Sequence, residues 1–335
     1  MTDKKILLGH GGGGSLSREL IKGLLLKNLD NPILKELSDS AVVDYREKIA
    51  FTTDSFVVSP LEFSGGDIGK LAVCGTVNDL VMQGAAPEYL SLALIIEEGL
   101  SYRMLEKVVG SIASAARACG VCVVTGDLKV VEHGACDKIF INTSGIGRVL
   151  KNRNLSLKNI RAGDKIILTG SIGRHGMAVL AGRKELGAGF NIASDCAALN
   201  GLLIPILKET GAVRFMRDPT RGGIAGVLNE MAEGTNLGMI IDEIDIPLSQ
   251  KVRAACELLG IDPLILANEG VALMAVSSEG AKKVLSLLRA HPLGVHARVI
   301  GIVSKKERGR LILNTVVGTR RVVDMPAGEL LPRIC

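Results

Sequence analysis

The chain has 335 residues, which is too long for one average core, so we expect two domains. Its 40 basic and 35 acidic residues are mixed along the sequence, and no Lys/Arg block or aromatic ladder supports nucleic-acid binding. No apolar run approaches the ~20 residues of a membrane helix, and no signal-peptide core follows Met1. We therefore expect a soluble, cytoplasmic protein with no membrane contact.

The first 150 residues alternate between helical and strand-like patterns. Residues 1–40 contain a glycine-rich opening and an amphipathic helix at about 15–26, and residues 41–150 form the expected N-terminal domain. The elements expected in that domain are strands at 41–43, 49–51, 90–96, 122–125 and 138–144, and helices at 68–82 and 101–119.

A polar stretch at residues 150–163 marks the crossing to a second domain, expected at 160–320. There the pattern restarts with a strand at 165–169, helices at about 175–186 and 197–209, and a helix that opens at 218–223 and runs to about 232. Strands that alternate with helices, with glycines at the strand ends, predict a mixed α/β fold of two domains.

The tail, residues 321–335, contains Pro326, Gly328 and Pro332, which oppose a continuous regular element. Extended, about 14 residues reach roughly 45 Å, enough to cross a domain. A disordered terminus is the alternative. However, a cysteine on the last residue has no packing purpose and is exposed to oxidation, so we expect Cys335 to be functional.

Four aspartates fall where loops meet strands or helices: Asp54, Asp67, Asp79 and Asp127. Carboxylates beside glycines suit Mg²⁺ shared with nucleotide phosphates, because hard cations take oxygen ligands. Asp67 also fits the N-cap of the helix at 68–82. An ideal helix separates Asp67 from Asp79 by roughly 16–18 Å, so one metal site needs other loops or a second subunit.

Two glycine segments are candidate phosphate sites. Residues 10–14, His-Gly-Gly-Gly-Gly, precede a helix but lack the Gly-Lys-Ser/Thr of a P-loop, and a flexible tether is the alternative. Arg221, Gly222 and Gly223 open a second helix, where Arg221 can bind phosphate oxygens in pairs. The spacing of Cys119 and Cys122 fits a redox or zinc motif, but no second ligand pair follows, which favours a structural role.

Several motifs occur in one order along the whole chain, and together they resemble one family. They are Thr53-Asp54, Gly65-Gly66-Asp67, Asn78-Asp79-Leu80, Gly126-Asp127, Pro219-Thr220-Arg221-Gly222-Gly223 and Pro332-Arg333-Ile334-Cys335. The set is similar to the HypE family of hydrogenase maturation proteins, which are carbamoyl dehydratases of the PurM-like, AIR synthase-related ATP-binding superfamily. The aspartate motifs are shared with sister families, whereas the terminal Pro-Arg-Ile-Cys is highly specific.

The resemblance implies a homodimer in which the N-terminal domains pair their sheets into an intersubunit β-barrel, with ATP and Mg²⁺ nearby. It implies that Cys335 receives a carbamoyl group from the carbamoyltransferase HypF. ATP then phosphorylates the carbamoyl oxygen, and elimination leaves a thiocyanate. The cyanide passes to iron on the HypC–HypD complex and becomes a ligand of the [NiFe]-hydrogenase iron centre.

The motifs also imply residue roles. Glu269 matches the proposed base, and Lys129 matches a position near the thiocarbamate. His133 is a further candidate. The expected metal ligands are the four aspartates, and the expected ATP-binding set adds the other motif positions: Asp54, Asp67, Asn78, Asp79, Asp127, Arg221, Gly222 and Gly223.

Two other functions remain open from the sequence. A sister enzyme, such as a selenophosphate synthetase, a thiamine-monophosphate kinase or an aminoimidazole-ribonucleotide synthetase, would use the same aspartates on a free small substrate. None of these explains a thiol on the last residue, and the chain has no Cys before Cys74 for selenophosphate chemistry. A non-catalytic carrier that presents Cys335 to partners is the second alternative.

Overall fold

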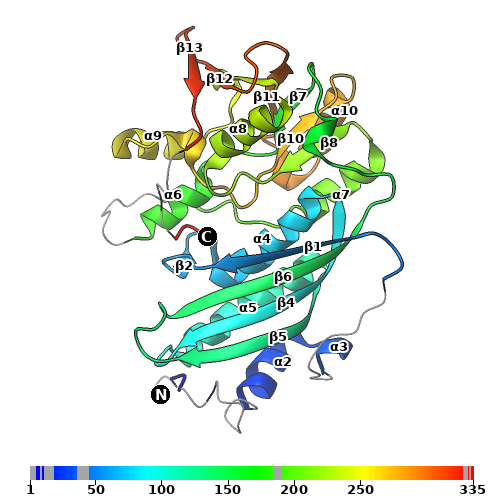
Figure 1. Ribbon diagram of the computed structural model, residues 1–335. Coiled ribbons are helices and arrows are strands. Elements are labelled where there is room, and N and C mark those ends of the chain that lie inside the picture. Colours follow the sequence, from blue (N-terminus) through cyan, green and yellow to red (C-terminus); the bar gives the residue numbers. More distant parts are fainter. Residues whose placement is uncertain are drawn as a thin grey trace.

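The computed structural model describes residues 5–7, 10, 19–35, 45–183, 191–326, 331 and 333–335. Two α/β units are stacked along the long axis of the molecule, and the C-terminus lies between them (Figure 1). The mixed α/β fold expected from the sequence is confirmed. The expected strand at 41–43, part of the expected helix at 15–26, glycines 11–14, part of the helix at 175–186 and tail residues 327–330 and 332 lie outside the described residues.

The N-terminal unit is a four-stranded sheet in the order β1-β6-β4-β5. Its elements are β1 (Ile49–Phe56), β2 (Glu62–Phe63), β3 (Gly66–Asp67), α4 (Ile68–Met82), β4 (Ala85–Glu97), α5 (Tyr102–Cys119), β5 (Cys122–Val131) and β6 (Ile139–Val149). Short helical segments precede them: η2 (Ile21–Leu25), α2 (Leu26–Leu29) and α3 (Pro32–Lys35).

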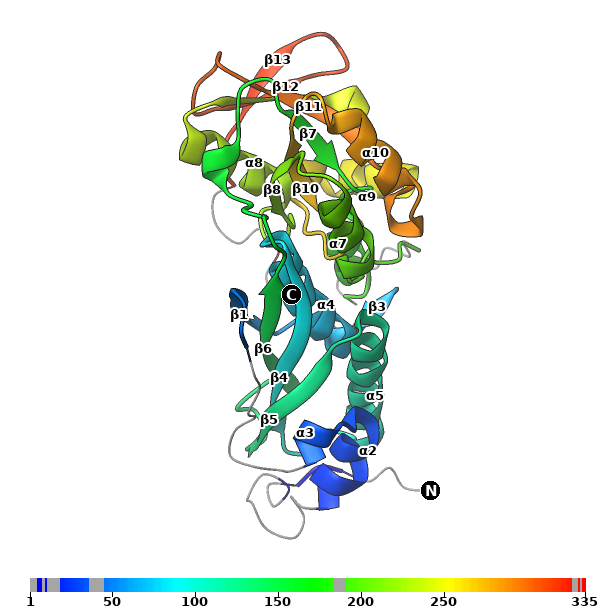
Figure 2. The same cartoon turned by 90° about the vertical axis from the view of Figure 1, so that its right-hand side faces the viewer.

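Helix α4 spans the predicted residues 68–82 because its sequence marks both its start and its burial. Asp67 caps it by accepting hydrogen bonds from the backbone nitrogens of Gly69 at 2.7 Å and Lys70 at 3.0 Å. Almost every residue of α4 is buried, so this largely apolar helix forms the centre of the unit. In contrast, α5 buries one apolar stripe on the same face of the sheet (Figure 2).

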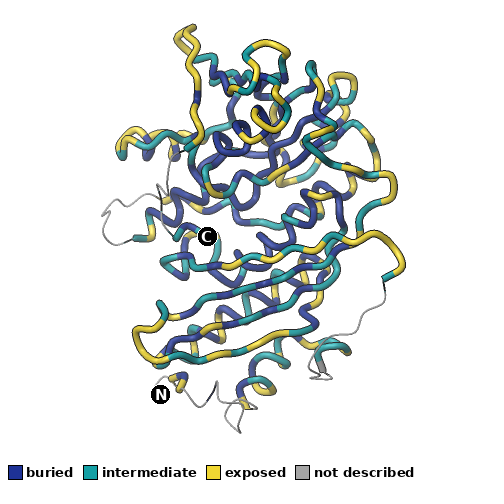
Figure 3. The backbone as a smooth tube through the Cα atoms, viewed as in Figure 1, coloured by how far each residue is buried: buried dark blue, intermediate teal, exposed yellow. Residues whose placement is uncertain are grey.

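The opposite face of the sheet carries exposed apolar side chains. Phe51 is 67% exposed, and Ile49 and Ile95 are about as accessible as polar surface residues, at 42% and 41%. Figure 3 shows exposed and intermediate segments alternating along β1 and β5. Large exposed apolar side chains gathered on one sheet face are typical of a protein–protein contact.

The C-terminal unit is a seven-stranded sheet in the order β13-β12-β9-β11-β7-β10-β8. Its strands are β7 (Lys165–Leu168), β8 (Val213–Arg217), β9 (Gly238–Asp242), β10 (Leu273–Val276), β11 (Arg298–Ser304), β12 (Leu311–Asn314) and β13 (Arg320–Val323). Its helices are α6 (Arg174–Ala181), α7 (Asn200–Glu209), α8 (Gly223–Thr235), α9 (Gln250–Leu259) and α10 (Ala281–Arg289), with short turns η3 (Leu157–Asn159), η5 (Glu243–Asp245), η6 (Pro263–Ile265) and η7 (Pro292–Gly294).

Strand β13 continues to Val323, so the tail leaves the sheet three residues later than the expected boundary at 321. Ladder hydrogen bonds to β12 hold this start of the tail. No helix in the described part of the chain is long and apolar enough to cross a membrane.

Candidate functional site: the junction of the two units

The last three residues of the tail are held by backbone hydrogen bonds where the two units meet. The carbonyl of Cys335 accepts from Val57 N at 3.1 Å, and that of Arg333 accepts from Ser59 N at 3.1 Å. Ile334 between them is 4% exposed and belongs to the main core. The tail therefore lies against the segment that follows β1, with Cys335 half-buried.

A histidine of the C-terminal unit, His175, also holds the tail. We call the site formed by Val57, Ser59 and His175 the seat of the tail. The Ser194 hydroxyl accepts from Cys196 N, so its own hydrogen is available to His175 Nδ1 at 2.9 Å. This arrangement puts the histidine proton on Nε2, which donates to the Ile334 carbonyl at 2.8 Å. Burial holds the pKa of His175 below its ordinary value, which fits the neutral ring that this relay requires.

Arg333 anchors the tail to the N-terminal sheet. Its Nε donates to the Val57 carbonyl at 2.9 Å, and its Nη1 pairs with Asp137 at 2.7 Å. Its guanidinium lies 5.8 Å from the centre of the Phe140 ring, within cation–π range. A planar cation that bonds in two directions fixes the register of the tail, and lysine would not reproduce this geometry.

Four carboxyl groups from both units gather where the units meet. Burial raises the pKa of Asp54, Asp79 and Glu269, and raises that of Asp218 to about 7. After burial, the charge of Asp79 acts on Asp218, and that of Asp218 acts on Glu269. Buried carboxyl groups that raise one another's pKa in this way would ionise together beside a cation.

The loop that carries Glu269 is fixed from both sides. Asp195 Oδ2 accepts from the backbone nitrogens of Glu269 at 3.0 Å and Gly270 at 2.9 Å. A Cβ on Gly270 would lie 1.9 Å from the Asp195 carbonyl oxygen, so only glycine fits there. Asn268 Nδ2 bonds the carbonyl of Pro219 at 2.9 Å, which ties this loop to the one that carries Asp218.

The structure separates the four expected metal ligands. Asp54 and Asp79 lie near each other, since Thr52 donates to Asp79 and the Asp54 charge acts on Asp79. Asp67 caps the far end of α4. Asp127 lies on β5, at the opposite edge of the sheet from β1, and pairs with Lys129 at 3.0 Å. Among the described residues, no three Asp, Glu, His or Cys side chains converge closely enough to hold a metal.

The other expected ATP-binding residues fall into two groups. Arg221 lies close enough to Asp54 to act on its charge, at the start of α8. Gly222 has a φ of 80° and Gly223 one of 59°, a backbone conformation that favours glycine, and a Cβ on Gly223 would lie 2.4 Å from the Leu264 carbonyl oxygen. Asn78, in contrast, is fully buried, and its amide bonds three backbone groups of the C-terminal unit, at Ala197, Leu199 and Glu269.

Lys129 lies in the same cross-strand row as Phe140, the residue whose ring Arg333 contacts. Lys129 pairs with Ile95, and Ile95 pairs with Phe140, so the three form one cross-strand row. Two strand spacings place Lys129 about 10 Å from the ring on which Arg333 stacks. His133 lies 3.1 Å from Glu97, in the loop between β5 and β6, and is mostly exposed. Cys119 is buried at the end of α5, where burial raises its thiol pKa to about 12, and Cys122 is exposed on β5.

Sequence reasoning missed Asp218, Asp195 and His175. Asp218 directly precedes the Pro219–Gly223 motif, and this position is a sequence signal that could have identified it. Asp195 and His175 carry no local signal, because their partners are distant in the sequence. His175, for example, bonds a residue 159 positions away.

Comparisons with known proteins agree with this geometry. Residues 37–149 match the model of the AIR synthase related protein N-terminal domain, and residues 161–314 match that of its C-terminal domain. The carbamoyl dehydratase HypE of Rhodobacter capsulatus is 44% identical over 338 residues, which cover 100% of this chain and 99% of that protein.

Solved structures give the same result. A crystal structure of HypE in complex with ATP is 44% identical, covers 98% of this chain and 99% of its own, and has a TM-score of 0.94. HypE in a HypE–HypF complex is 45% identical, with 93% and 100% covered and a TM-score of 0.81. A thiamine-monophosphate kinase of Stenotrophomonas maltophilia, at 16% identity, coverage of 94% and 99%, and a TM-score of 0.67, shares the fold alone.

Proposed function

This chain belongs to the AIR synthase related family and, within it, to the HypE carbamoyl dehydratases; from that membership we propose that it converts a carbamoyl group on Cys335 into a thiocyanate, using ATP. The observation that carries the proposal is the seat of the tail. Hydrogen bonds to Cys335, Ile334 and Arg333 hold the last residue at the junction where Asp54, Asp79, Asp218 and Glu269 gather.

The reaction starts from the thiocarbamate S–C(=O)–NH₂ on Cys335. Its carbonyl oxygen attacks the γ-phosphorus of ATP, which releases ADP. Phosphate then leaves with that oxygen while the nitrogen loses both protons, and the C≡N bond forms. ATP is converted to ADP and phosphate, and the net change on the cysteine is the loss of one water. Phosphorylation is needed because the carbamoyl oxygen is otherwise a poor leaving group.

Glu269 is the proposed proton acceptor. Burial raises the pKa of its carboxyl well above the ordinary value, followed by the charges of Asp218 and Asp195. A raised pKa makes the ionised carboxylate a stronger base. The seat supplies the positioning, since His175 holds the Ile334 carbonyl just before the reacting residue and Val57 N holds the backbone oxygen of Cys335 itself. We assign Lys129 to the developing negative charge on the carbamoyl oxygen.

The aspartates fit a magnesium–nucleotide ligand, because burial raises the pKa of Asp54, Asp79 and Asp218 and a bound cation would favour their ionised forms. We propose that Asp54 and Asp79 hold Mg²⁺, with Asp218 beside them, and that Asp67 and Asp127 join the nucleotide site. Arg221 and the backbone of Gly222 and Gly223 would contact phosphate oxygens. When bound, Mg²⁺ neutralises charge on the transferring phosphoryl group.

We propose that two copies pair through the open face of the N-terminal sheet into an intersubunit β-barrel. Phe51, Ile49 and Ile95 give that face its apolar character. Asp127 and Lys129 lie on the strand furthest from β1, so pairing would let one copy complete the nucleotide site of the other.

The partners follow from the chemistry. A relative has been crystallised with HypF, and we propose HypF as the carbamoyl donor and the HypC–HypD complex as the cyanide acceptor for hydrogenase iron. Each transfer requires the tail to leave its seat. We place the reaction in the cytoplasm, where Cys335 would stay reduced between transfers.

The direct test is the intact mass of the protein after incubation with HypF, carbamoyl phosphate and ATP. We expect a carbamoyl adduct that loses one water only with hydrolysable ATP, and no adduct on Cys335→Ala. An adduct on Cys335 that never loses water would leave only the carrier function. ATP turnover on a free small substrate, without an adduct, would instead indicate a sister kinase or synthetase.

A further inference from the structure

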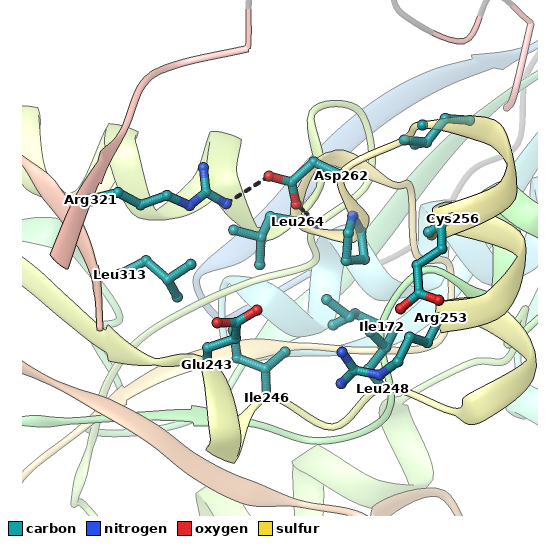
Figure 4. Close-up of a pocket in the computed structure, with 14 residues that line it drawn as sticks. Ile172, Glu243, Ile246, Leu248, Arg253, Cys256, Asp262, Leu264, Leu313 and Arg321 are labelled. Carbon is teal, nitrogen blue, oxygen red and sulfur yellow. Dashed lines mark hydrogen bonds and ion pairs between the residues drawn. The ribbon is translucent and has the colours of Figure 1, made fainter. Parts of the chain in front are cut away.

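Two hollows lie side by side in the C-terminal unit, and Arg253, Ile246 and Leu248 line both. The first, of about 420 Å³, is shown in Figure 4. There Arg321 pairs with Asp262 at 2.8 Å, and carboxylates of two glutamates also line the wall. Its three carboxylates therefore outnumber its two arginines, Arg253 and Arg321, by one, so the charges nearly balance.

The second hollow, of about 550 Å³, is not balanced. Four arginines line it, Arg174, Arg253, Arg289 and Arg298, together with His296, and among the residues that the structure describes no carboxylate belongs to its lining. The ion pairs recorded for the described part of the chain include none of these four arginines. Arg253 also faces the carboxylates of the first hollow, but the other three arginines line only the second one. Like charges gathered in this way repel one another, so the natural complement of this hollow is an anion.

Three of the four arginines are held in place before any ligand binds. Arg174 Nε donates to the Ala193 carbonyl at 3.1 Å, and Arg289 Nε donates to the Ala297 carbonyl at 2.9 Å. Arg298 reaches the Ile244 carbonyl through Nη1 at 3.5 Å. Arg174 and Arg289 thus use Nε on the backbone and keep both terminal nitrogens for a ligand, which lowers the entropy cost of binding.

Two serines add further donors. Ser249 is the N-cap of α9, so the positive end of this ten-residue helix lies at the hollow. The Oγ of Ser171, also in the lining, is buried and has no hydrogen-bond partner among the described residues. An oxygen of a bound ligand would satisfy that hydroxyl.

We propose that this hollow binds a phosphate-bearing small molecule. Phosphate oxygens match several guanidinium groups, a hydroxyl and a helix N-terminus at once, and the volume suits a ligand of nucleotide size. The hollow differs from the acidic junction in one testable respect. The junction needs a cation before it can accept phosphates, whereas the hollow supplies the positive charge itself, so binding there is independent of Mg²⁺.

The test is calorimetric titration of the full chain with inorganic pyrophosphate in the presence of EDTA. We expect saturable binding by the unaltered protein, weakened about tenfold or more by Arg253→Ser and by Arg298→Ser. The matched control is Arg308→Ser, which removes the same charge from an exposed position outside the hollow. Absence of saturable binding, or equal weakening in all three variants, overturns the proposal.

A second measurement needs no variant. Phenylglyoxal modifies accessible arginines, and peptide mass mapping gives the rate at each one. Pyrophosphate should slow the modification of Arg253 and Arg298 at least about fivefold relative to Arg308, since a bound anion occupies their terminal nitrogens. Equal rates at these arginines with and without pyrophosphate contradict the site. Neither measurement uses turnover, so the result is independent of the dehydratase reaction.

Discussion

Asp54 and Asp127 lie on the two outer strands of one sheet, yet their surroundings differ in every respect. Asp54 on β1 lies near α4 and the C-terminal unit, where burial raises its pKa. Asp127 on β5 is exposed, and Lys129 lowers its pKa. The β1 edge thus provides enclosed carboxyl groups, and the β5 edge provides an accessible ion pair. A nucleotide site that needs both edges requires two chains.

The largest expected effect comes from disrupting the proposed contact between two copies at the open face of the N-terminal sheet. Phe51→Asp places a charge where Phe51 is 67% exposed, so we expect a monomer in which ATP turnover falls by about 100-fold or more. Sedimentation and ADP release measure the two effects. Val317→Asp, at a residue 79% exposed in the C-terminal unit, is the control and should stay dimeric. A dimeric Phe51→Asp protein with normal turnover would refute the shared site.

Mixing two inactive variants sharpens the comparison. Asp54→Asn and Asp127→Asn should each be inactive alone, because each variant lacks the carboxylate that one edge of the sheet contributes to the site. After subunit exchange, about a quarter of normal turnover should return, since half of the dimers are mixed and each mixed dimer keeps one intact site. No recovery, with exchange verified by mass, would mean that both aspartates serve the same chain.

Removing a tail contact should have a moderate effect. His175→Phe keeps a flat ring against Phe63 but removes the donor to Ile334, so thiocyanate formation should slow by about tenfold. Carbamoylation by HypF should be unchanged, because it takes place off the seat. A matching loss in both steps would indicate a general folding defect.

The buried carboxyl groups beside β1, Asp218 among them, should contribute less to the stability of the protein as the pH rises. The folded-state pKa of Asp218 is about 7, above the unfolded value, so the folded state binds more protons and this contribution is lost between about pH 4 and 7. We expect the free energy of unfolding to fall by up to about 4 kcal/mol over that range, and Asp218→Asn to flatten the dependence. Asp127, with a lowered pKa, has the opposite sign. Denaturant titrations at several pH values, without nucleotide, measure the slope.

The smallest effect concerns the end of α4 far from Asp79. Asp67→Ala removes the cap to Gly69 and Lys70, and should lower the unfolding free energy by about 1 kcal/mol. Asp67→Ser keeps a capping oxygen and is the matched control. If nucleotide affinity falls in both variants while stability recovers in Asp67→Ser, then Asp67 binds nucleotide as well as capping the helix.

Local features of this fold were predictable, and long-range ones were not. Helix α4 was predicted to the residue, because Asp67 and a continuous apolar run are adjacent in the sequence. Strand β5 continues to Val131, beyond the predicted end at 125, because pairing with β4 extends it past Gly126. The proximity of Asp218 to Asp54 depends on how the units dock, and no spacing in the sequence encodes it. A functional role for Cys335 was predictable from the sequence, but the residues that hold the tail were not, because they are distant from it in the sequence.

The bonds recorded between the seat and the tail involve the carbonyls of Arg333, Ile334 and Cys335, together with the Arg333 side chain. The segment at Val57 and Ser59 therefore adds the tail much as a sheet edge adds a short strand, largely by its main chain. Such a tail acts as a tethered ligand, with an effective concentration on the order of millimolar for a short flexible linker. An affinity far weaker than that of a free substrate is enough to fill the seat. The same weakness allows the cysteine to leave for a partner enzyme and return.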